Sequence, residues 1–384
     1  MSDAPVYSID PLAFHADPYP ALARMQADTP FCFVPELGAT LMTRRDDIHA
    51  QEKRTQVFSS HQPGGLMTVL LGENMMRKDG AAHMAERRAL FPALSPRTVA
   101  THWKPIFTAF ADRLLHDIAP TGACDLVTQV AMPISAAALK AITGLQDMTE
   151  TEMDGVSQAM IDGCANYAGD ALVESRCHAA TALIDRHIDA MWDRATPPSA
   201  LAVQRAAGVA PPSIHANIKL IISGGQNEPR DAIAGCVAAL LAHPEALEAA
   251  RSGAVTWQQV FAEYARWMSP IGMSPRRVAQ ADTVRGVQFN PDDRVFLMFG
   301  AAGRDPAHFE QPDRFDVTRD TQPAISFGAG PHFCAGAAAS RCLIAEVALP
   351  LIFDRLPGLR LTGPVDYAGW AFRGPLRVPV AWDV

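Results

Sequence analysis

Residues 326–336 read SFGAGPHFCAG, in which three glycines and a proline surround Cys334. The apolar segment AAASRCLIAEVAL (337–349), typical of a helix, follows directly. Glycines permit backbone conformations that bring amide N–H groups close to a ligand atom, and the start of a helix favours negative charge. Both features favour a thiolate that accepts several N–H hydrogen bonds, as a sulfur ligand of iron does. A buried cysteine in a glycine-rich turn is the simpler alternative.

The composition argues against several classes of protein. The chain has 384 residues, 48% hydrophobic and 19% charged, which is enough apolar material for a large core. Its formal net charge of -8 argues against a nucleic acid partner, because phosphate binding requires a basic face. No apolar run reaches about 18 residues, and the N-terminus lacks the pattern of a secretion signal. We therefore expect a cytoplasmic protein without a membrane-spanning segment.

The seven cysteines are scattered along the chain and include no Cys-x-x-Cys pair. Neither a disulfide framework nor a structural zinc site is therefore expected. Most of these cysteines should be small buried hydrophobic residues, and Cys334 is the exception.

The hydrophobic pattern predicts one domain, residues 1–384, that is mainly α-helical with small β-sheets. Apolar residues recur at spacings of three and four through most of 81–241, interrupted by a Pro- and Ala-rich loop at 195–212. Strands and helices do not alternate, which argues against a parallel nucleotide-binding sheet. Further helices are predicted at 18–26, after 257 and from 336, and strands at 31–34, 39–43, 277–279, 285–289, 295–299 and within 374–384.

Residues 218–242, IKLIISGGQNEPRDAIAGCVAALLA, are apolar enough for a long buried helix but carry two glycines and Pro229 at their centre. An interior glycine costs about 1 kcal/mol relative to alanine, and an interior proline costs about 3 kcal/mol or more. The pattern leaves open whether the stretch forms one broken helix or two helices joined by a turn.

The loop SFGAGPHFCAG resembles the haem-binding loop of the cytochrome P-450 family, and three other segments strengthen the resemblance. EYAR (263–266) resembles the family's Glu-x-x-Arg pair, and GRDPAHFEQPDRFDVTR (303–319) resembles the segment that precedes the haem loop. DGAAHMAERR (79–88) resembles its Asp-x-x-x-His-x-x-x-Arg-Arg segment. The similarity extends over nearly the whole chain.

This resemblance implies a mainly helical fold that holds haem b between a distal central helix and the proximal helix after the cysteine loop. Cys334 would be the thiolate ligand of the iron, a ligand that promotes cleavage of the O–O bond. Electrons would come from a soluble iron–sulfur ferredoxin and a flavin reductase. The remaining cofactor-binding residues implied are Phe327 and Gly328 in the loop, and His83, Arg87, Arg277 and His332 at the haem propionates.

The Glu-x-x-Arg resemblance implies a structural role for Glu263 and Arg266. At positions i and i+3 of a helix, their side chains share one face and can form an ion pair. In the family an arginine of the following segment closes this network, and Arg314 is the candidate here.

The central stretch departs from the family pattern. Members usually follow the glycine with an acid and a threonine, which relay protons during oxygen activation. Here Asn227 stands at the position of the acid and Glu228 at that of the threonine. Glu228 could carry protons itself, since burial raises a carboxyl pKa towards neutrality. The alternative is that Glu228 satisfies backbone groups freed by Pro229.

The resemblance also implies which residues surround the substrate, and Asn-Glu-Pro together with GWAFRGP (369–375) resembles bacterial guaiacol-type aromatic O-demethylases. Cys164 stands where phenylalanine is expected and residues 67–70 are aliphatic, so we expect a small apolar substrate rather than guaiacol itself. The predicted pocket residues are Val69, Leu70, Gly224, Gly225, Ile271 and Phe372.

The resulting prediction is a haem-thiolate monooxygenase that uses O2 and two electrons to hydroxylate or O-demethylate a small apolar substrate. The missing threonine leaves a peroxide-using or isomerising haem-thiolate enzyme as one alternative. A non-enzymatic haem sensor is the other.

Overall fold

Helices form most of the structure, a computed structural model that describes residues 1–167 and 169–384. Three π-helical turns, η2 (Val99–Trp103), η4 (Val127–Ala131) and η6 (Cys342–Ala348), continue into the helices that follow them. The α-helices are α1 (Pro11–Ala16), α2 (Tyr19–Asp28), α3 (Arg45–Gln51), α4 (Leu66–Leu71), α5 (Gly80–Leu94), α6 (Pro96–Thr98), α7 (Lys104–Ile118), α8 (Met132–Thr143), α9 (Glu150–Cys164), α10 (Ala171–Met191), α11 (Ala200–Ala206), α12 (Pro211–Ser223), α13 (Asn227–Ala242), α14 (Pro244–Arg251), α15 (Trp257–Met268), α16 (Phe299–Ala302), α17 (Ala337–Arg341) and α18 (Leu349–Arg355).

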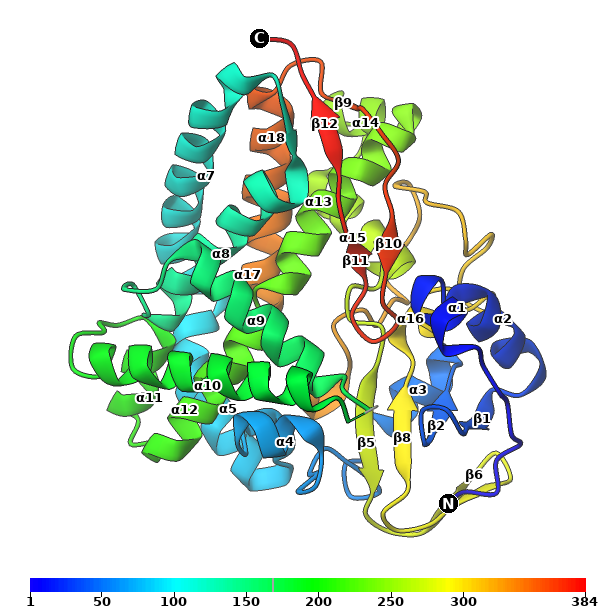
Figure 1. Cartoon of the computed structure of the whole chain (residues 1–384). Helices are drawn as coiled ribbons and strands as arrows, with labels where there is room; N and C mark the ends of the chain where they lie inside the picture. The colour runs from blue at the N-terminus through cyan, green and yellow to red at the C-terminus, as the bar shows by residue number, and fades with distance from the viewer. Residues whose placement is uncertain (168) are drawn as a thin grey trace.

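The strands are short and fall into small sheets, as the sequence predicted. The five-stranded sheet has the order β1-β2-β8-β5-β3, in which β2 and β8 are parallel and the other pairs antiparallel. It lies beside α1, α2 and α3 on one side of the molecule (Figure 1). The strands are β1 (Phe31–Val34), β2 (Ala39–Met42), β3 (Phe58–Ser59), β4 (Ala123–Asp125), β5 (Ser274–Val278), β6 (Asp282–Val284), β7 (Val287–Phe289), β8 (Arg294–Leu297), β9 (Arg360–Leu361), β10 (Tyr367–Ala368), β11 (Gly374–Pro375) and β12 (Pro379–Ala381).

Three predicted segments differ from the structure. The strand expected at 285–289 is a hairpin of β6 and β7, because Arg285 and Gly286 both adopt positive φ and form a tight turn. The last strand is divided into β11 and β12, which pair in different sheets. The loop expected at 195–212 contains α11, whose sequence ALAVQRA is rich in good helix formers.

The central stretch forms two helices with a break between them. α12 ends at Ser223 and α13 begins at Asn227, so Pro229 lies in the first turn of α13, where its missing N–H costs nothing. The Ser135 hydroxyl donates to the carbonyl of Gln226 at 2.7 Å, so a serine of α8 satisfies a backbone carbonyl at the break. The Ser157 hydroxyl of α9 lies 3.1 Å from the Ile222 carbonyl and 2.7 Å from Asn227 Oδ1, to which it donates.

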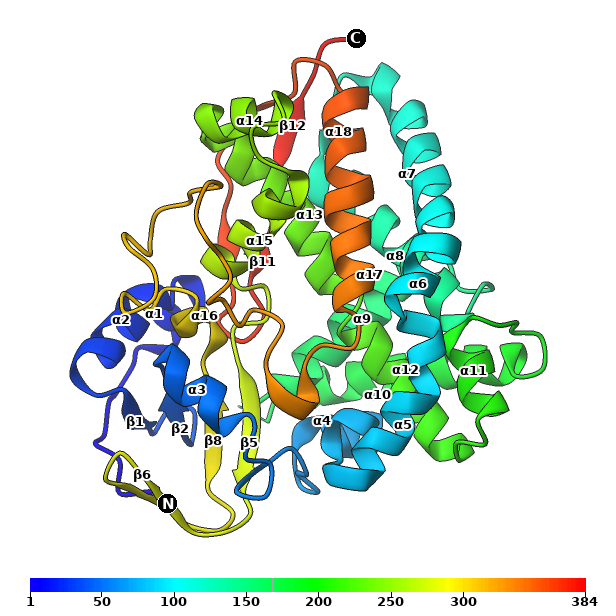
Figure 2. The ribbon, with the colours of Figure 1, turned by 180° about the vertical axis from the view of Figure 1, so that it is seen from behind.

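Helix α13 runs through the centre of the helical part, and twelve of its residues are buried. It packs against α8, α15 and η6. The segments α17, η6 and α18 follow the cysteine loop as one continuous helical rod. This rod lies alongside α13 (Figure 2). The helical rod that follows the cysteine loop thus packs against α13, which begins directly after the break at 224–226.

Among the described residues, no single helix is long and apolar enough to span a membrane. The helical segments Pro211–Ala242 and Pro244–Arg251 reach the length and apolar composition of a membrane span only when they are counted together, and the chain bends sharply between them.

Candidate active site

The loop before α17 holds Cys334 at an exposed position of the chain. Gly328 and Gly330 adopt φ of +72° and +65°, which side chains disfavour, and the Cys334 N–H donates to the carbonyl of Phe327 at 2.9 Å. Desolvation raises the pKa of the Cys334 thiol, while the Gly336 N–H lowers it. The loop geometry is as expected, whereas the preference for a thiolate remains a prediction for the metal-bound sulfur, since burial of the thiol opposes it in the protein alone.

Glu52, a residue that no motif identified, fastens the cysteine loop to α3. Its buried carboxylate accepts a hydrogen bond of 2.5 Å from the Ala329 N–H and pairs with Arg276 at 3.3 Å. A Cβ on Gly328 would lie 3.3 Å from its Oε1, so the glycine leaves room for this contact. Burial raises the pKa of Glu52 to about 7. In the sequence, Glu52 has the surroundings of an ordinary solvated residue at a helix end. Only its tertiary contacts identify it as an anchor of the cysteine loop.

Two of the predicted propionate-binding residues, His83 and His332, lie together, with ring centroids 4.1 Å apart. His332 Nε2 lies 2.9 Å from Asp79 Oδ1, and the other oxygen of Asp79 accepts from Ser59 Oγ at 2.6 Å. Although desolvation opposes it, these bonds lower the pKa of Asp79 to about 2. Burial lowers the pKa of His332 to about 4, so we assign an anionic Asp79 beside a neutral histidine.

The two predicted arginines differ in their surroundings. Arg87 donates to the carbonyl of Phe333, next to Cys334, at 2.5 Å. Arg277 is instead paired with the exposed Asp292 at 2.7 Å, and its neighbour Arg276 is the buried arginine of β5. Alternate residues of a strand point to opposite faces, so one guanidinium is buried and the next is not. The structure therefore gives Arg277 a protein partner that the sequence did not predict.

The predicted pair Glu263 and Arg266 is fully buried, and two hydrogen bonds of 2.7 Å join its members. The expected role of Arg314 is wrong. Only its backbone carbonyl takes part, accepting from Arg266 at 3.1 Å, and its side chain is exposed. The arginine whose side chain reaches Glu263 is Arg319, at 3.4 Å. The path of the chain through this segment, rather than the motif, decides which arginine turns inward.

Asn227 and Glu228 point to different surroundings. The Asn227 side chain accepts from Ser157 and donates to Gln158, both at 2.7 Å, so it is engaged with α9. Within the described residues, neither carboxyl oxygen of Glu228 has a hydrogen-bond partner. Burial raises its pKa from 4.5 to about 8, and its charge would raise the pKa of Cys334. The Glu228 carboxyl is therefore close enough to Cys334 for their charges to interact.

Of the residues predicted to surround the substrate, the structure joins only some to one another. Ile271 and Phe372 form a β-bridge, strengthened by a 2.8 Å bond from the Gly272 N–H to the carbonyl of Ala371. Leu70 is buried, whereas Val69 is 59% exposed, because successive residues of the short helix α4 point in different directions. The exposure of Val69 argues against a place in the wall of the pocket, and substitution of Val69 tests it.

The two glycines of the break serve different purposes. A Cβ on Gly224 would meet only the Leu220 carbonyl, at 3.5 Å, so the space beside it is open. A Cβ on Gly225 would lie 2.9 Å from Leu139 Cδ1 and 2.6 Å from the Ile221 carbonyl oxygen. Gly225 is small because α8 packs against it, which explains the glycine without a substrate. That substrate lies against Gly225 remains a prediction.

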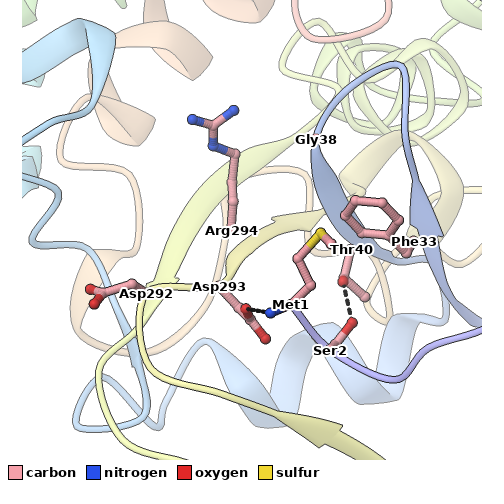
Figure 3. Close-up of a pocket in the computed structure, with 8 residues that line it drawn as sticks. All are labelled: Met1, Ser2, Phe33, Gly38, Thr40, Asp292, Asp293 and Arg294. Atoms are coloured by element: carbon pink, nitrogen blue, oxygen red, sulfur yellow. Dashed lines mark hydrogen bonds and ion pairs between the residues drawn. The ribbon is translucent and has the colours of Figure 1, made fainter.

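A cleft of about 220 Å³ lies elsewhere, at the edge of the five-stranded sheet (Figure 3). The Met1 amino group pairs there with Asp293 at 3.0 Å, and the Ser2 and Thr40 hydroxyls are 2.7 Å apart. None of the predicted site residues lines this cleft.

Comparisons with known proteins agree with this geometry. Residues 256–355, which contain the Glu263 pair and the cysteine loop, match the family model described as Cytochrome P450. Putative cytochrome P450 133B2 of Xylella fastidiosa is 30% identical over 293 residues, 71% of this chain and 70% of that protein. Cytochrome P450 107B1 of Saccharopolyspora erythraea is 28% identical over 81% of this chain and 77% of its own length.

The same fold occurs in solved structures. P450BioI in complex with acyl carrier protein ligated to hexadec-9Z-enoic acid superposes with a TM-score of 0.88, covering 97% of this chain and 100% of that one at 22% identity. The chain belongs to the cytochrome P450 family of monooxygenases.

The family implies a haem bound through cysteine, and the residues present fit one. Cys334 is exposed just before the start of α17, and a Cβ at Gly224 would enter open space. Two buried arginines, Arg77 and Arg276, have nitrogens without partners in the described part of the chain, which suits a nearby anionic group.

Proposed function

We propose that this chain is a haem-thiolate monooxygenase that acts on a small, largely apolar organic substrate. The observation that carries the proposal is the exposed Cys334 in its glycine loop together with the Glu228 carboxyl, which is buried, has no hydrogen-bond partner among the described residues and is close enough to influence Cys334 electrostatically. A metal-binding sulfur and a proton-carrying group are the two functions that such a reaction needs from the protein.

The residues that would hold the haem are Cys334 as the iron ligand and Arg87, His332 and Arg276 near its carboxylates. The haem, when bound, supplies the chemistry of oxygen activation, which the thiolate ligand promotes. Cys334 has its backbone fixed by the loop, and Glu52 holds that loop at Ala329. The protein therefore controls the position of the sulfur through two independent anchors.

Glu228 would supply protons to the reaction. One oxygen atom enters the substrate and the other leaves as water, which consumes two electrons and two protons. With a pKa of about 8, Glu228 is mostly protonated at neutral pH and exchanges its proton within the physiological range. Ser135 already satisfies the Gln226 carbonyl at the helix break, and neither carboxyl oxygen of Glu228 bonds to any group among the described residues, which argues against Glu228 serving only to satisfy the backbone. Asn227 would position α9 and carry no proton.

The substrate would lie beside Gly224, Ile271 and Phe372, with Leu70 behind them. The pocket residues are apolar, which supports hydroxylation or O-demethylation of a small apolar molecule. Electrons would come from NAD(P)H through a flavin reductase and a soluble ferredoxin, as the family resemblance implies.

The test is replacement of the sulfur. Cys334→Ala should abolish the thiolate-type spectrum of the reduced CO complex, and Cys342→Ala, one turn or more into the following helix, should retain it. Oxygenated product should form only with the parent and the Cys342 variant when reductase, ferredoxin and NAD(P)H are supplied. A Cys334→Ala protein with an unchanged spectrum contradicts the proposal.

The position of Glu228 favours a second candidate, a peroxide-using enzyme, because the usual threonine is absent and an acid stands in its place. Such an enzyme would turn over faster with hydrogen peroxide alone than with reductase and ferredoxin. Comparing the two rates on one substrate decides between the candidates, and no product with either donor would favour a haem sensor.

A further inference from the structure

Arg230 lies in the first turn of α13 and joins two carboxylates. Its Nη1 donates to Asp154 Oδ1 of α9 at 3.0 Å, and its Nε donates to Asp231 Oδ1 of its own helix at 2.8 Å. The Arg230 side chain is only 14% exposed, so salt screens these pairs weakly. Although burial opposes it, Asp231 and Asp154 raise the pKa of Arg230, and the guanidinium carries its full charge. Arg230 therefore connects the start of α13 to α9 through a charged hydrogen bond.

Two further side chains at the start of α13 reach the same face of α9. Gln226 Nε2 also donates to Asp154 Oδ1, at 3.0 Å. Asn227 accepts from Ser157 and donates to Gln158. Residues 154, 157 and 158 share one face of α9 because they lie three and four positions apart. The start of α13 is therefore held against α9 by a row of polar contacts.

The second carboxylate partner of Arg230 lies against the loop that carries Phe372. Asp231 is buried, and β11 packs on α13 at this point. A Cβ on Gly374 of β11 would overlap the Asp231 carboxyl group, so this glycine allows the strand to lie directly against it. Two residues earlier in the same loop, Phe372 forms the β-bridge to Ile271. Arg230 and Asp231 thus lie where α9, α13 and the Phe372 loop meet.

Glu228 stands in the same turn of α13 but points in another direction. Successive residues of an α-helix are about 100° apart, so Glu228 and Arg230 are about 200° apart around the axis. Neither carboxyl oxygen of Glu228 has a hydrogen-bond partner in the part of the chain that the structure describes. Its position therefore depends on the backbone turn that carries it, which Arg230 holds from the other side. Burial is the main cause of the raised pKa of Glu228, and the charges of Asp231 and Arg230 also act on it.

We propose that Arg230 is a positioning residue for the monooxygenase reaction. It holds the first turn of α13 between α9 and the Phe372 loop, and thereby keeps the Glu228 carboxyl in place. It acts through Glu228 and contacts neither the substrate nor the haem. This inference rests on the proposed function, in which Glu228 supplies protons, and deepens it by naming the residue that holds the proton donor.

Loss of the bridge would change the products rather than the consumption of electrons. Insertion of one oxygen atom into the substrate, with the other released as water, consumes two electrons and two protons per O2. Release of hydrogen peroxide consumes the same two electrons and two protons and leaves the substrate unchanged. A displaced Glu228 therefore lowers product per NAD(P)H and raises hydrogen peroxide by the same amount.

The first experiment asks whether Arg230 and Glu228 act as one unit. Product and hydrogen peroxide per NAD(P)H are measured, at equal haem concentration, for the parent, Arg230→Met, Glu228→Gln and the double variant. The probes are 4-methylanisole, ethylbenzene and limonene, and the one that the parent oxidises best is used throughout. Arg230→Met should lower the product yield about threefold or more, an effect typical of residues in one network. The double variant should match Glu228→Gln alone.

Two outcomes of this experiment overturn the proposal. One is a product yield of Arg230→Met equal to that of the parent. The other is a double variant whose loss is the product of the two single losses, because residues that act independently have additive free-energy effects. A purely structural arginine would give this second result.

The second experiment protects the test against loss of folding. Arg230→Met leaves Asp154 and Asp231 without their cation, so Arg230→Gln combined with Asp154→Asn provides a variant with the charge balance kept. This variant should show the same loss of product at normal haem content. Arg230→Lys should recover part of the yield, since an ammonium keeps the charge but lacks the planar fork that bridges both carboxylates. The proposal fails if the charge-balanced variant couples as the parent does.

An exposed ion pair provides the matched control. Arg194 pairs with Asp147 at 2.8 Å, and its side chain is 64% exposed. Arg194→Met should retain the product yield of the parent, because an exposed pair contributes little to the fold. An equal loss of product in Arg194→Met and Arg230→Met would contradict a specific role for Arg230.

A third measurement needs no substrate. Below pH 7 a carboxyl with a pKa of about 8 is mostly protonated, so the C=O stretch of Glu228 is the infrared band that Glu228→Gln lacks. Arg230→Met should shift or broaden this band, and Arg194→Met should leave it unchanged. An unchanged band in Arg230→Met contradicts the proposal. If Glu228→Gln couples as the parent does, the proposed role of Glu228 fails together with this inference. If only Arg230→Met couples as the parent does, this inference alone fails.

Discussion

Arg266 donates two hydrogen bonds of 2.7 Å to the carboxylate of Glu263, and neither side chain is exposed to solvent. The remaining hydrogen-bonding capacity of Arg266 is used by the carbonyls of Gly303, Pro312 and Arg314. This pair therefore ties α15 to the segment that leads into the cysteine loop, and it acts on the site through the fold.

We predict that Glu263→Ala yields little folded, haem-loaded protein. Removing one member of a buried ion pair leaves the other charge uncompensated, which costs about 3–5 kcal/mol. The free energy of unfolding and the haem content per chain measure the effect. Normal haem content with altered substrate preference would contradict the structural role.

The same network provides a matched pair of controls. Arg319→Ala should destabilise the protein measurably, because the Arg319 side chain reaches Glu263 and also donates to the carbonyls of Glu310 and Gln311. Arg314→Ala should be close to the parent, because only the backbone of Arg314 contributes. Equal destabilisation by the two variants would contradict this assignment.

The two glycines of the helix break should respond differently to alanine. Gly225→Ala forces a Cβ against Leu139 and the Ile221 carbonyl, and overpacking of this kind typically costs about 1–3 kcal/mol. Gly224→Ala should fold as the parent does and change ligand affinity, because its Cβ would enter open space. Thermal unfolding and ligand titration of both variants distinguish the two roles, and a destabilised Gly224→Ala protein would be inconsistent with the open space.

We expect Phe372→Ala to weaken binding of apolar ligands about tenfold or more, as the loss of a large aromatic contact surface predicts. Val69→Ala is the control, since the exposed Val69 side chain should contribute nothing to the pocket. Dissociation constants and product profiles for both variants provide the measurement. If Phe372→Ala matches the parent in both respects, Phe372 does not border the substrate.

Glu228→Gln should preserve folding and ligand affinity but reduce product formed per NAD(P)H consumed, with hydrogen peroxide accounting for the missing electrons. Loss of a catalytic proton donor typically reduces the rate by about 10²–10⁴, and we expect the lower end because water can partly substitute. Asn227→Ala should couple better than Glu228→Gln, because the amide is engaged with α9 and does not titrate. Coupling by Glu228→Gln equal to that of the parent at every pH would exclude the carboxyl as proton donor.

The pKa of Glu228 also predicts how stability depends on pH. Between its ordinary value of 4.5 and about 8, the folded state keeps a proton that the unfolded state releases. This group therefore stabilises the fold fully at low pH, and its contribution is lost as the pH rises towards 8. Glu228→Gln lacks this dependence, so its unfolding free energy relative to the parent should increase across that window. A constant difference would indicate that the carboxyl is ionised in the folded protein.

The sequence alone determined the family, the mainly helical fold and the central residues of the site. Cys334, His332 and the Glu263–Arg266 pair are identified by local spacing, because a loop and a single helical turn fix how such neighbours are presented. Two helices separated by a break were one of the two alternatives that the sequence left open. The low helix propensity of Gly-Gly and Pro229 indicated a disruption, but it could not show which groups satisfy the backbone carbonyls at the break.

Tertiary structure decided what depends on contacts between distant segments. It showed that Arg319 rather than Arg314 reaches Glu263, that Glu52 anchors the cysteine loop, and that Val69 faces solvent. It also showed Arg77 buried, with one guanidinium nitrogen that has no hydrogen-bond partner among the described residues, although its sequence surroundings suggest an ordinary surface cation. Local sequence fixes which groups are available, but the burial and pairing of a charge depend on which segments the fold brings around it.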